Sequence, residues 1–481
     1  VTRVALIHPT RRRRLEMTVA LTRTKAEQAF PELFEAAAAR LPGGAAMAEA
    51  RKAAIGAFVS LGLPHRRIEE WKYTDLRSAL KEALPPAVSA RTQVTRGQLD
   101  AALAELAAVD AYRVVLVDGA FRPELSAVDA ADVAVTSLAA ALADGSTEAL
   151  ASAEVPGQEA VIALNAAFLT DGAVVRVADG AQPAKPLLLV FVRASREPRL
   201  VTLRNRLDIG AGAQATVIEA HVALPGAAPG QANVLTEVHI GKGASLVHAK
   251  CTLEGAGATH LGSWLATIGA GATYQPFQVS AGTGLVRNHL AATFAGEGGK
   301  IDVAACFLGR DAEHIDTTLV IDHAVPGCVS RELAKGVLTG RARGVFQGKV
   351  IVRPDAQKTD GKQMAQALML SEEAEFDSKP ELEIFADDVV CGHGSTAAQL
   401  DEDMLFYLRS RGIPHDQARA LLIESFVGEV FDKLENERLR EALWAIARAR
   451  LADLIRGDRG ERRQSPGQVS PIENARMRRG V

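Results

Sequence analysis

The spacing of apolar residues changes twice along the chain. Between residues 26 and 61 they recur every three or four residues in AEQAFPELFEAAAARL and MAEARKAAIGAFVSLG, which predicts two helices separated by the PGG turn at 42–44. Between residues 200 and 370 the chain instead shows short alternating runs such as ATVIEAHV and SLVHAKCTL, which are typical of β-strands. Helical spacing returns at Asp401 and predicts three further helices. The pattern therefore predicts a β region with helices on either side.

A glycine-bearing phrase recurs within the β region. It reads DIGAGAQAT, HIGKGASLV, TIGAGATYQ and FAGEGGKID, and its first glycines are Gly210, Gly241, Gly269 and Gly296, which are 31, 28 and 27 residues apart. Glycine supplies the positive φ angles of tight turns. A repeat of this length made of strands indicates a solenoid whose coils stack about 4.8 Å apart. We therefore predict a mainly β protein built on a right-handed parallel β-helix. Two packed antiparallel sheets would fit the alternation but not the repeat.

These patterns divide the chain into six segments. We expect a disordered extension at 1–16, a helical domain at 17–110, a mixed α/β linker at 111–185, the β-helix at 186–400, a helical domain at 401–455 and a disordered tail at 456–481. The first of these lacks the apolar run of a secretory signal and precedes a methionine, so we interpret it as an upstream extension of the reading frame. The stretch RRIEEWKYTDL is expected to anchor a loop onto the neighbouring helices.

Composition narrows the class of partner. The chain has 481 residues, 48% of them hydrophobic, and its 55 basic and 58 acidic residues give a formal net charge of -3. This balance predicts no nucleic-acid partner, and no apolar run approaches the ~18 residues of a membrane span. The four cysteines (Cys251, Cys306, Cys328 and Cys391) are widely spaced and form no C-x-x-C pair, which favours a reducing cytoplasm over a disulfide framework.

One cysteine is placed differently from the rest. In DDVVCGHG, Cys391 and His393 lie two residues apart in an expected strand, so their side chains point the same way from Cα atoms roughly 6–7 Å apart. A thiolate and an imidazole could share a soft metal or a sulfur species, although two residues cannot complete a four-ligand site. The alternative is a buried thiol beside a hydrogen-bonded histidine. We assign the other three cysteines to the core.

Enzyme motifs are weak or missing. No Gly-Lys pair is followed by Ser or Thr, so there is no Walker A motif and the chain alone should not hydrolyse nucleotide. A carbohydrate-active β-helix enzyme remains an alternative, with Asp316 and Asp322 of EHIDTTLVIDHAVPGCVSRE as its paired carboxylates. Six residues along one strand span roughly 20 Å, which is too far for such a pair. The solvated outer face of a coil is the preferred interpretation of this stretch.

Several of these stretches together resemble a known family. RRIEEWKYTDL, the continuous segment at 314–413 that contains HIDTTLVIDHAVPGCVSRELAKGVLTGRARGVFQGKV, and the helices that follow it resemble the SufB/SufD family of iron-sulfur cluster assembly proteins. ADDVVCGHG indicates the SufD branch in particular. The resemblance covers residues 20–455, and the family fold is a parallel β-helix flanked by helical regions, in agreement with the repeat.

The resemblance also implies a function. It implies a non-catalytic scaffold that pairs with a SufB-like chain through the β-helix and docks a SufC-like ABC ATPase on its C-terminal helices. By similarity, Cys391 and His393 would face the SufB-like chain, whose cysteine completes a site for a transient iron-sulfur cluster or its iron and sulfur precursors. His393 is the better ligand, because a neutral imidazole need not lose a proton, whereas a buried thiol must. A homodimer of the isolated chain and a self-sufficient metal protein stay open.

Overall fold

The protein is a parallel β-solenoid with helices packed on both of its faces. A computed structural model describes residues 22–88, 92–143 and 156–464; the expected extension at 1–16 lies outside them, and so do residues 465–481 of the expected tail. The helices are α1 (Lys25–Ala37), α2 (Gly44–Leu61), α3 (Leu76–Ala79), α4 (Arg96–Ala102), α5 (Leu138–Ala143), α6 (Glu159–Phe168), α7 (Glu402–Ser410), α8 (His415–Phe431) and α9 (Glu437–Gln464).

The strands form two sheets. They are β1 (Tyr112–Val117), β2 (Ala120–Phe121), β3 (Val133–Ser137), β4 (Ala173–Val177), β5 (Leu187–Arg193), β6 (Leu200–Ile209), β7 (Gln214–Ala223), β8 (Gln231–Ile240), β9 (Ser245–Leu253), β10 (Gly255–Ile268), β11 (Thr273–Ala281), β12 (Thr283–Phe294), β13 (Lys300–Gly309), β14 (His314–His323), β15 (Val329–Leu338), β16 (Arg343–Val352), β17 (Asp360–Met369), β18 (Glu375–Ile384) and β19 (Val390–Ala398).

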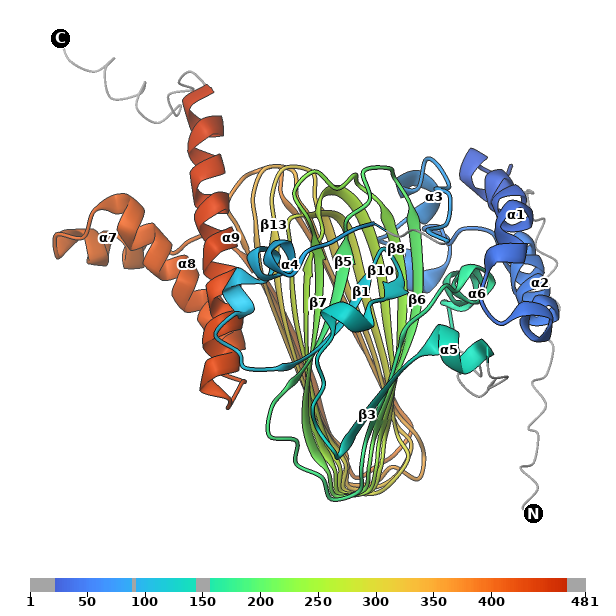
Figure 1. Cartoon of the computed structure of the whole chain (residues 1–481). Coiled ribbons are helices and arrows are strands. Elements are labelled where there is room, and N and C mark those ends of the chain that lie inside the picture. The colour runs from blue at the N-terminus through green and yellow to red at the C-terminus, as the bar shows by residue number, and fades with distance from the viewer. Residues whose placement is uncertain (1–21, 89–91, 144–155, 465–481) are drawn as a thin grey trace, which may run out of the picture.

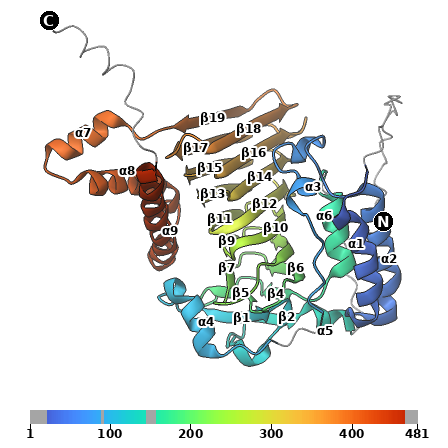
Figure 2. The same cartoon turned by 90° about the horizontal axis from the view of Figure 1, so that it is seen from above.

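Each coil of the solenoid gives one strand to each sheet. From β5 onward, odd-numbered strands follow one another in a ten-stranded sheet that ends at β19, and even-numbered strands form a nine-stranded sheet that ends at β18. All these pairings are parallel, whereas β1 with β2 and β3 with β4 are antiparallel and close the other end. Figure 2 shows the resulting ladder from β1 to β19. The predicted parallel solenoid is therefore confirmed.

The recurring phrase marks the turns between coils, and its two glycines have different roles. Gly243 has a φ of 67°, which is the left-handed conformation that the second glycine was expected to supply. Gly241 is needed for another reason, because a Cβ there would lie 2.7 Å from the backbone nitrogen of Ala211 in the previous coil. The first glycine of the phrase thus permits close stacking, and the second permits the turn.

Apolar side chains fill the space between the sheets and cover both outer faces. Inward-pointing apolar residues of successive strands form a large cluster between the sheets. On the outside, α1, α2 and α6 cover the nine-stranded sheet, and α8 and α9 cover the ten-stranded sheet (Figure 1). Cys251 and Cys306 lie under the C-terminal helices and Cys328 lies between the sheets, so all three are buried, as expected. No described helix has the length and apolar character to cross a membrane.

Capping residues fix several of the helix starts. Thr24 and Glu27 form a capping box at α1, in which each side chain accepts a hydrogen bond from the other residue's backbone N–H. Asp401 accepts hydrogen bonds from the N–H groups of Asp403 and Met404 at the start of α7, and Asn436 accepts one from Leu439 in α9. The helices predicted at both ends of the chain are therefore present.

The prediction that the outer face of β14 is solvated is wrong. Asp316 points outward from the sheet but is fully buried, because the segment around Trp71 covers it. Its carboxylate accepts hydrogen bonds from Arg287 and Thr74, and the Arg287 guanidinium lies 3.9 Å from the centre of the Trp71 ring. The RRIEEWKYTDL stretch thus anchors the N-terminal region onto the sheet. The charge of Asp316 is balanced by Arg287 and its carboxylate is inaccessible to a substrate, so Asp316 is removed as a catalytic carboxylate.

One carboxyl group inside the solenoid has no such partner. Glu332 on β15 is buried between the sheets, and no described residue forms a hydrogen bond with either of its carboxyl oxygens. Burial raises its pKa to about 8. The side chain is therefore expected to be neutral at pH 7.

Replacing Asp316 by Ala is expected to lower the free energy of unfolding by about 3–5 kcal/mol, because it leaves the buried Arg287 without its counter-charge. Asp322 is the matched control, since its partner Arg353 is exposed and surface pairs contribute about 1 kcal/mol or less. Urea denaturation of Asp316→Ala and Asp322→Ala measures both. Equal losses would contradict the structural role of Asp316.

Replacing Glu332 by Gln is expected to remove a pH dependence of stability. Between pH 4.5 and about pH 8 the unfolded chain ionises this glutamate and the folded chain does not, so stability falls as pH rises, by about 1.4 kcal/mol per pH unit. Denaturation at pH 5.5 and pH 7.5 should show this slope in the wild type and a smaller one in Glu332→Gln. The exposed Glu383→Gln is the control. Parallel slopes in all three proteins would show that Glu332 is not held neutral.

Candidate functional site

Cys391 and His393 lie on the last strand of the ten-stranded sheet. Strand β19 pairs only with β17, with Cys391 beside Gly361 and His393 beside Gln363, and its other edge has no partner among the described residues. Cys391 packs against the cluster between the sheets, so alternation directs both side chains inward at the open end of the solenoid. The two residues thus share one side of the strand.

The exposure of this pair differs from that of the other candidate residues. His393 is exposed and Cys391 is partly exposed, whereas the three other cysteines are buried. Only Cys391 of the four cysteines therefore combines access to solvent with a neighbouring imidazole. A pair buried far from any free surface would have been unable to meet another chain.

The environment of Cys391 keeps its thiol protonated. Partial burial raises the pKa of the thiol, the hydrogen bond from the Gly361 backbone opposes this, and the charge of Asp360 raises the pKa further. The sulfur lies close to Gly361, since a Cβ there would be in van der Waals contact with Sγ at 3.6 Å. Cys391 must therefore lose a proton before it can bind a metal ion as a thiolate.

A short row of polar side chains leads inward from His393. Glu332, Gln363 and His393 are successive partners across β15, β17 and β19, so about 10 Å separates the first from the last. The Gln363 amide nitrogen donates to the backbone oxygen of Glu381 in the opposite sheet, 3.1 Å away, which holds the side chain across the interior. Its amide oxygen has no partner among the described residues. The space behind His393 is therefore polar.

The pair does not make a metal site by itself. Nowhere in the described residues do three or more His, Cys, Asp or Glu side chains gather closely enough to hold a metal ion. Cys391 and His393 supply one sulfur and one nitrogen donor, which is half of a tetrahedral set. Further ligands would have to come from outside this part of the chain.

The open end of the solenoid is also apolar. Phe385, which follows β18, is 63% exposed, and Val390 at the start of β19 is 61% exposed. Ile384 and Met364 lie on the same two coils and are also exposed. Together with the unpaired edges of β18 and β19, these side chains make a surface suited to contact with another protein.

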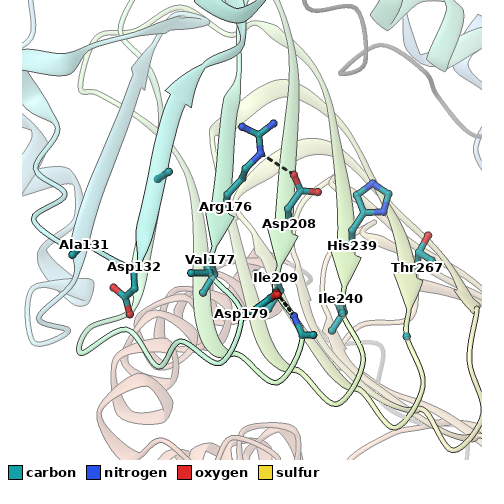
Figure 3. A pocket seen from close by; sticks show the side chains of 16 residues that line it. Ala131, Asp132, Arg176, Val177, Asp179, Asp208, Ile209, His239, Ile240 and Thr267 are labelled. Carbon is teal, nitrogen blue, oxygen red and sulfur yellow. Dashed lines mark hydrogen bonds and ion pairs between the residues drawn. The ribbon is translucent and has the colours of Figure 1, made fainter.

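A hollow elsewhere on the molecule lacks this chemistry. It has a volume of about 660 Å³ and lies on the outer face of the nine-stranded sheet beside the glycine turns (Figure 3). Several of its charged residues have partners within it: Arg176 lies 3.5 Å from Asp208, and Asp179 accepts a hydrogen bond from the Ala211 N–H. It contains no cysteine. Its one histidine, His239, lies on β8, far along the solenoid from Cys391 on β19.

Sequence reasoning missed a second group of polar residues. Strands β7, β9 and β10 direct several ionisable side chains into the interior, where an apolar core was expected; they are Glu219, His221, His248, Lys250 and His260. The available signal was the alternation in ATVIEAHV and SLVHAKCTL, which places polar residues at inward positions.

The chain is similar to proteins of one family over most of its length. Residues 24–189 match the family described as "SufBD protein N-terminal region", and residues 191–426 match "SUF system FeS cluster assembly, SufBD core domain". Relatives include an iron-sulfur cluster assembly SufBD family protein of Synechocystis, 33% identical over 80% of this chain and 86% of its own, and the iron-sulfur cluster assembly protein SufD of Escherichia coli, 32% identical over 81% and 90%.

A more distant relative has the same description. The iron-sulfur cluster assembly protein SufD of Bacillus subtilis is 28% identical over 59% of this chain and 65% of its own. The two family matches together span the N-terminal helices, the solenoid and the start of the C-terminal helices. The chain therefore belongs to the SufBD family of iron-sulfur cluster assembly proteins.

Proposed function

We propose that this protein is a non-catalytic scaffold subunit that pairs with a SufB-like chain through the open end of its solenoid. The observation that carries the proposal is that β18 and β19 both have an unpaired edge, and that β19 presents Cys391 and His393 at that edge. A second chain that covers this end could supply the missing ligands. The site would then hold a transient iron-sulfur cluster, or its iron and sulfur precursors, between the two chains.

The chemistry of the surface supports such a pairing. Edge strands are normally shielded by charges or by covering segments, because their free N–H and C=O groups invite pairing. Strand β18 carries charged residues and Pro380, but the end of the final coil also exposes Phe385 and Val390. Desolvation of these side chains would favour association, and closure over Cys391 would exclude water from a cluster.

The C-terminal helices offer a separate docking surface, which we assign to a SufC-like ABC ATPase. Helix α7 projects away from the solenoid (Figure 2) and leaves Phe406 70% exposed and Tyr407 50% exposed. Met404 on the same helix and Leu421 on α8 are also exposed. Nucleotide hydrolysis would belong to that partner, since this chain has no Walker A motif.

The connection between the two surfaces is short, which suggests how the ATPase acts on the site. Only residues 399–401 separate the end of β19 from the start of α7. A displacement of α7 by the ATPase would therefore pull on the strand that carries Cys391 and His393, and could open the paired solenoids. All four cysteines are unpaired, which suits a reducing compartment such as the cytoplasm.

Replacing His393 by Ala is expected to lower iron and sulfide content without dissolving the complex. We would express the chain with a SufB-like chain and the ATPase, purify the complex anaerobically, and measure its mass, iron and sulfide. Removing a ligand should weaken metal binding by roughly tenfold or more, at least as much as the loss of an outer-shell partner. The exposed His415→Ala is the matched control. Wild-type loading of His393→Ala would remove the site assignment.

Two phenylalanine variants are expected to separate the two interfaces. Phe406→Asp should weaken capture of the ATPase at least tenfold and leave pairing with the SufB-like chain intact, because it places a charge on α7 alone. Phe385→Asp should do the reverse. Pull-down of each partner with each variant measures both effects. If one variant lost both partners, or if neither variant lost any partner, the assignment would be contradicted. A homodimer that only Phe385→Asp abolishes would place a second copy at the same end.

A further inference from the structure

The middle of the solenoid contains a buried polar network far from the open end. Glu219 on β7 is its centre and accepts hydrogen bonds from the Thr236 hydroxyl at 3.0 Å, the Trp264 indole at 3.1 Å and His248 Nε2 at 3.0 Å. His221 Nε2 lies 3.2 Å from its other oxygen. All these residues are buried, so the network is closed off from bulk water on its sides.

Lys250 extends across the interior from one sheet to the other. It lies beside Glu219 in the ten-stranded sheet, and its amine approaches Gly262 in the nine-stranded sheet. A Cβ on Gly262 would lie 2.1 Å from Lys250 Nζ, 2.8 Å from His260 Nε2 and 3.3 Å from Asn288 Oδ1. Three polar atoms from three strands therefore converge over one glycine, and any side chain at this position would displace them.

Two of the three converging atoms have no hydrogen-bond partner in the described part of the protein. Neither His260 Nε2 nor Asn288 Oδ1 has a hydrogen-bond partner among the described residues, although both residues are buried. The other ends of both side chains are fixed: His260 Nδ1 lies 2.8 Å from a Glu254 carboxylate oxygen, and Asn288 Nδ2 donates to the Ser280 hydroxyl at 2.9 Å. Because a carboxylate only accepts, Nδ1 carries the proton and Nε2 is an acceptor.

Lys250 supplies the complementary group. Its ammonium has three donors and no acceptors, and Nζ lies 5.7 Å from the centre of the Trp264 ring. Burial lowers its pKa to about 8 against the opposing charges of Glu219 and Glu254, so it is still protonated at pH 7. Burial also lowers the pKa of His260, to about 3, which keeps the imidazole neutral.

A small space lies beside the network. A recess of about 20 Å³ is lined by Phe191, Arg193, His221 and Glu254, among others, and it reaches the carboxylate that holds His260. A volume above about 10–15 Å³ accommodates one water molecule. Space for one molecule of this size therefore lies beside the Glu254 carboxylate.

We propose that Lys250, His260 and Asn288 form a binding site for a ligand of one heavy atom that carries two donor hydrogens, namely a water molecule, above Gly262. The water oxygen accepts a hydrogen bond from Lys250 Nζ, and its two hydrogens are donated to His260 Nε2 and Asn288 Oδ1. Three partners are typical of an internal water. One molecule thus satisfies two acceptors that are otherwise unpaired, and it gives the Lys250 ammonium a polar partner inside the solenoid.

A crystal structure of the full chain at about 1.5 Å resolution tests the site directly. We expect an ordered water within about 3.2 Å of Lys250 Nζ, His260 Nε2 and Asn288 Oδ1. Direct hydrogen bonds from Lys250 to His260 or Asn288, with no water between them, would overturn the proposal.

Two variants test it independently. Gly262→Ala should expel the water and lower the melting temperature by several degrees, whereas Gly56→Ala, at a helical glycine with open space around it, should not. Lys250→Met should fold with a lower melting temperature, because it leaves the buried charges of Glu219 and Glu254 without the opposing charge of Lys250, and it should lose the water density. A water that persists in Lys250→Met, or a Gly262→Ala protein as stable as the wild type, would overturn the proposal.

Discussion

Backbone hydrogen bonding between successive coils is the constraint on which the rest of the structure depends. Each strand is held by the coil before it and the coil after it, so a parallel solenoid satisfies its own N–H and C=O groups everywhere except at its two ends. The antiparallel strands β2 and β3 close one end. The other end stops at β18 and β19 with free edges, and this is where the exposed imidazole and the partly exposed thiol lie.

The same constraint explains why side chains distant in sequence act together. In a parallel solenoid, an inward residue of one coil lies directly beside the inward residue at the same place in the next coil. Glu332, Gln363 and His393 therefore form a row, although about 30 residues separate each from the next. The interior network around Glu219 arises in the same way from neighbouring coils. Stacking thus converts single polar residues in successive repeats into continuous polar files, without any local sequence motif.

The sequence predicted those features that depend on local backbone requirements. The recurring glycine phrase predicted the solenoid because positive φ angles and close stacking leave few alternatives to glycine at Gly241 and Gly243. Alternation alone predicted that Cys391 and His393 share one side of a strand. The resemblance of the segment at 314–413 predicted the family, which the comparisons then established.

The features that the sequence did not reveal depend on contacts across the fold. Asp316 reads as a solvated residue of an alternating strand, and only its contact with Thr74, 242 residues away, shows that it is buried. The sequence does not show that Lys250 reaches Gly262, because this contact exists only where the two sheets face each other. The return of helical spacing at Asp401 predicted that the strand of Cys391 is the last, but the free outer edge of this strand required the structure.

The anchoring of the Trp71 segment on Arg287 and Asp316 imposes an order on folding during translation. The segment leaves the ribosome 242 residues before Asp316 is made, which at 5–20 residues per second is a delay of roughly 12–50 seconds. For the first part of that interval, until the strands that carry Leu200 and Leu261 are made, the aromatic and apolar side chains of the first helices have no sheet to cover. Newborn chains would therefore depend on chaperones for longest at the N-terminus, the part that is synthesised first.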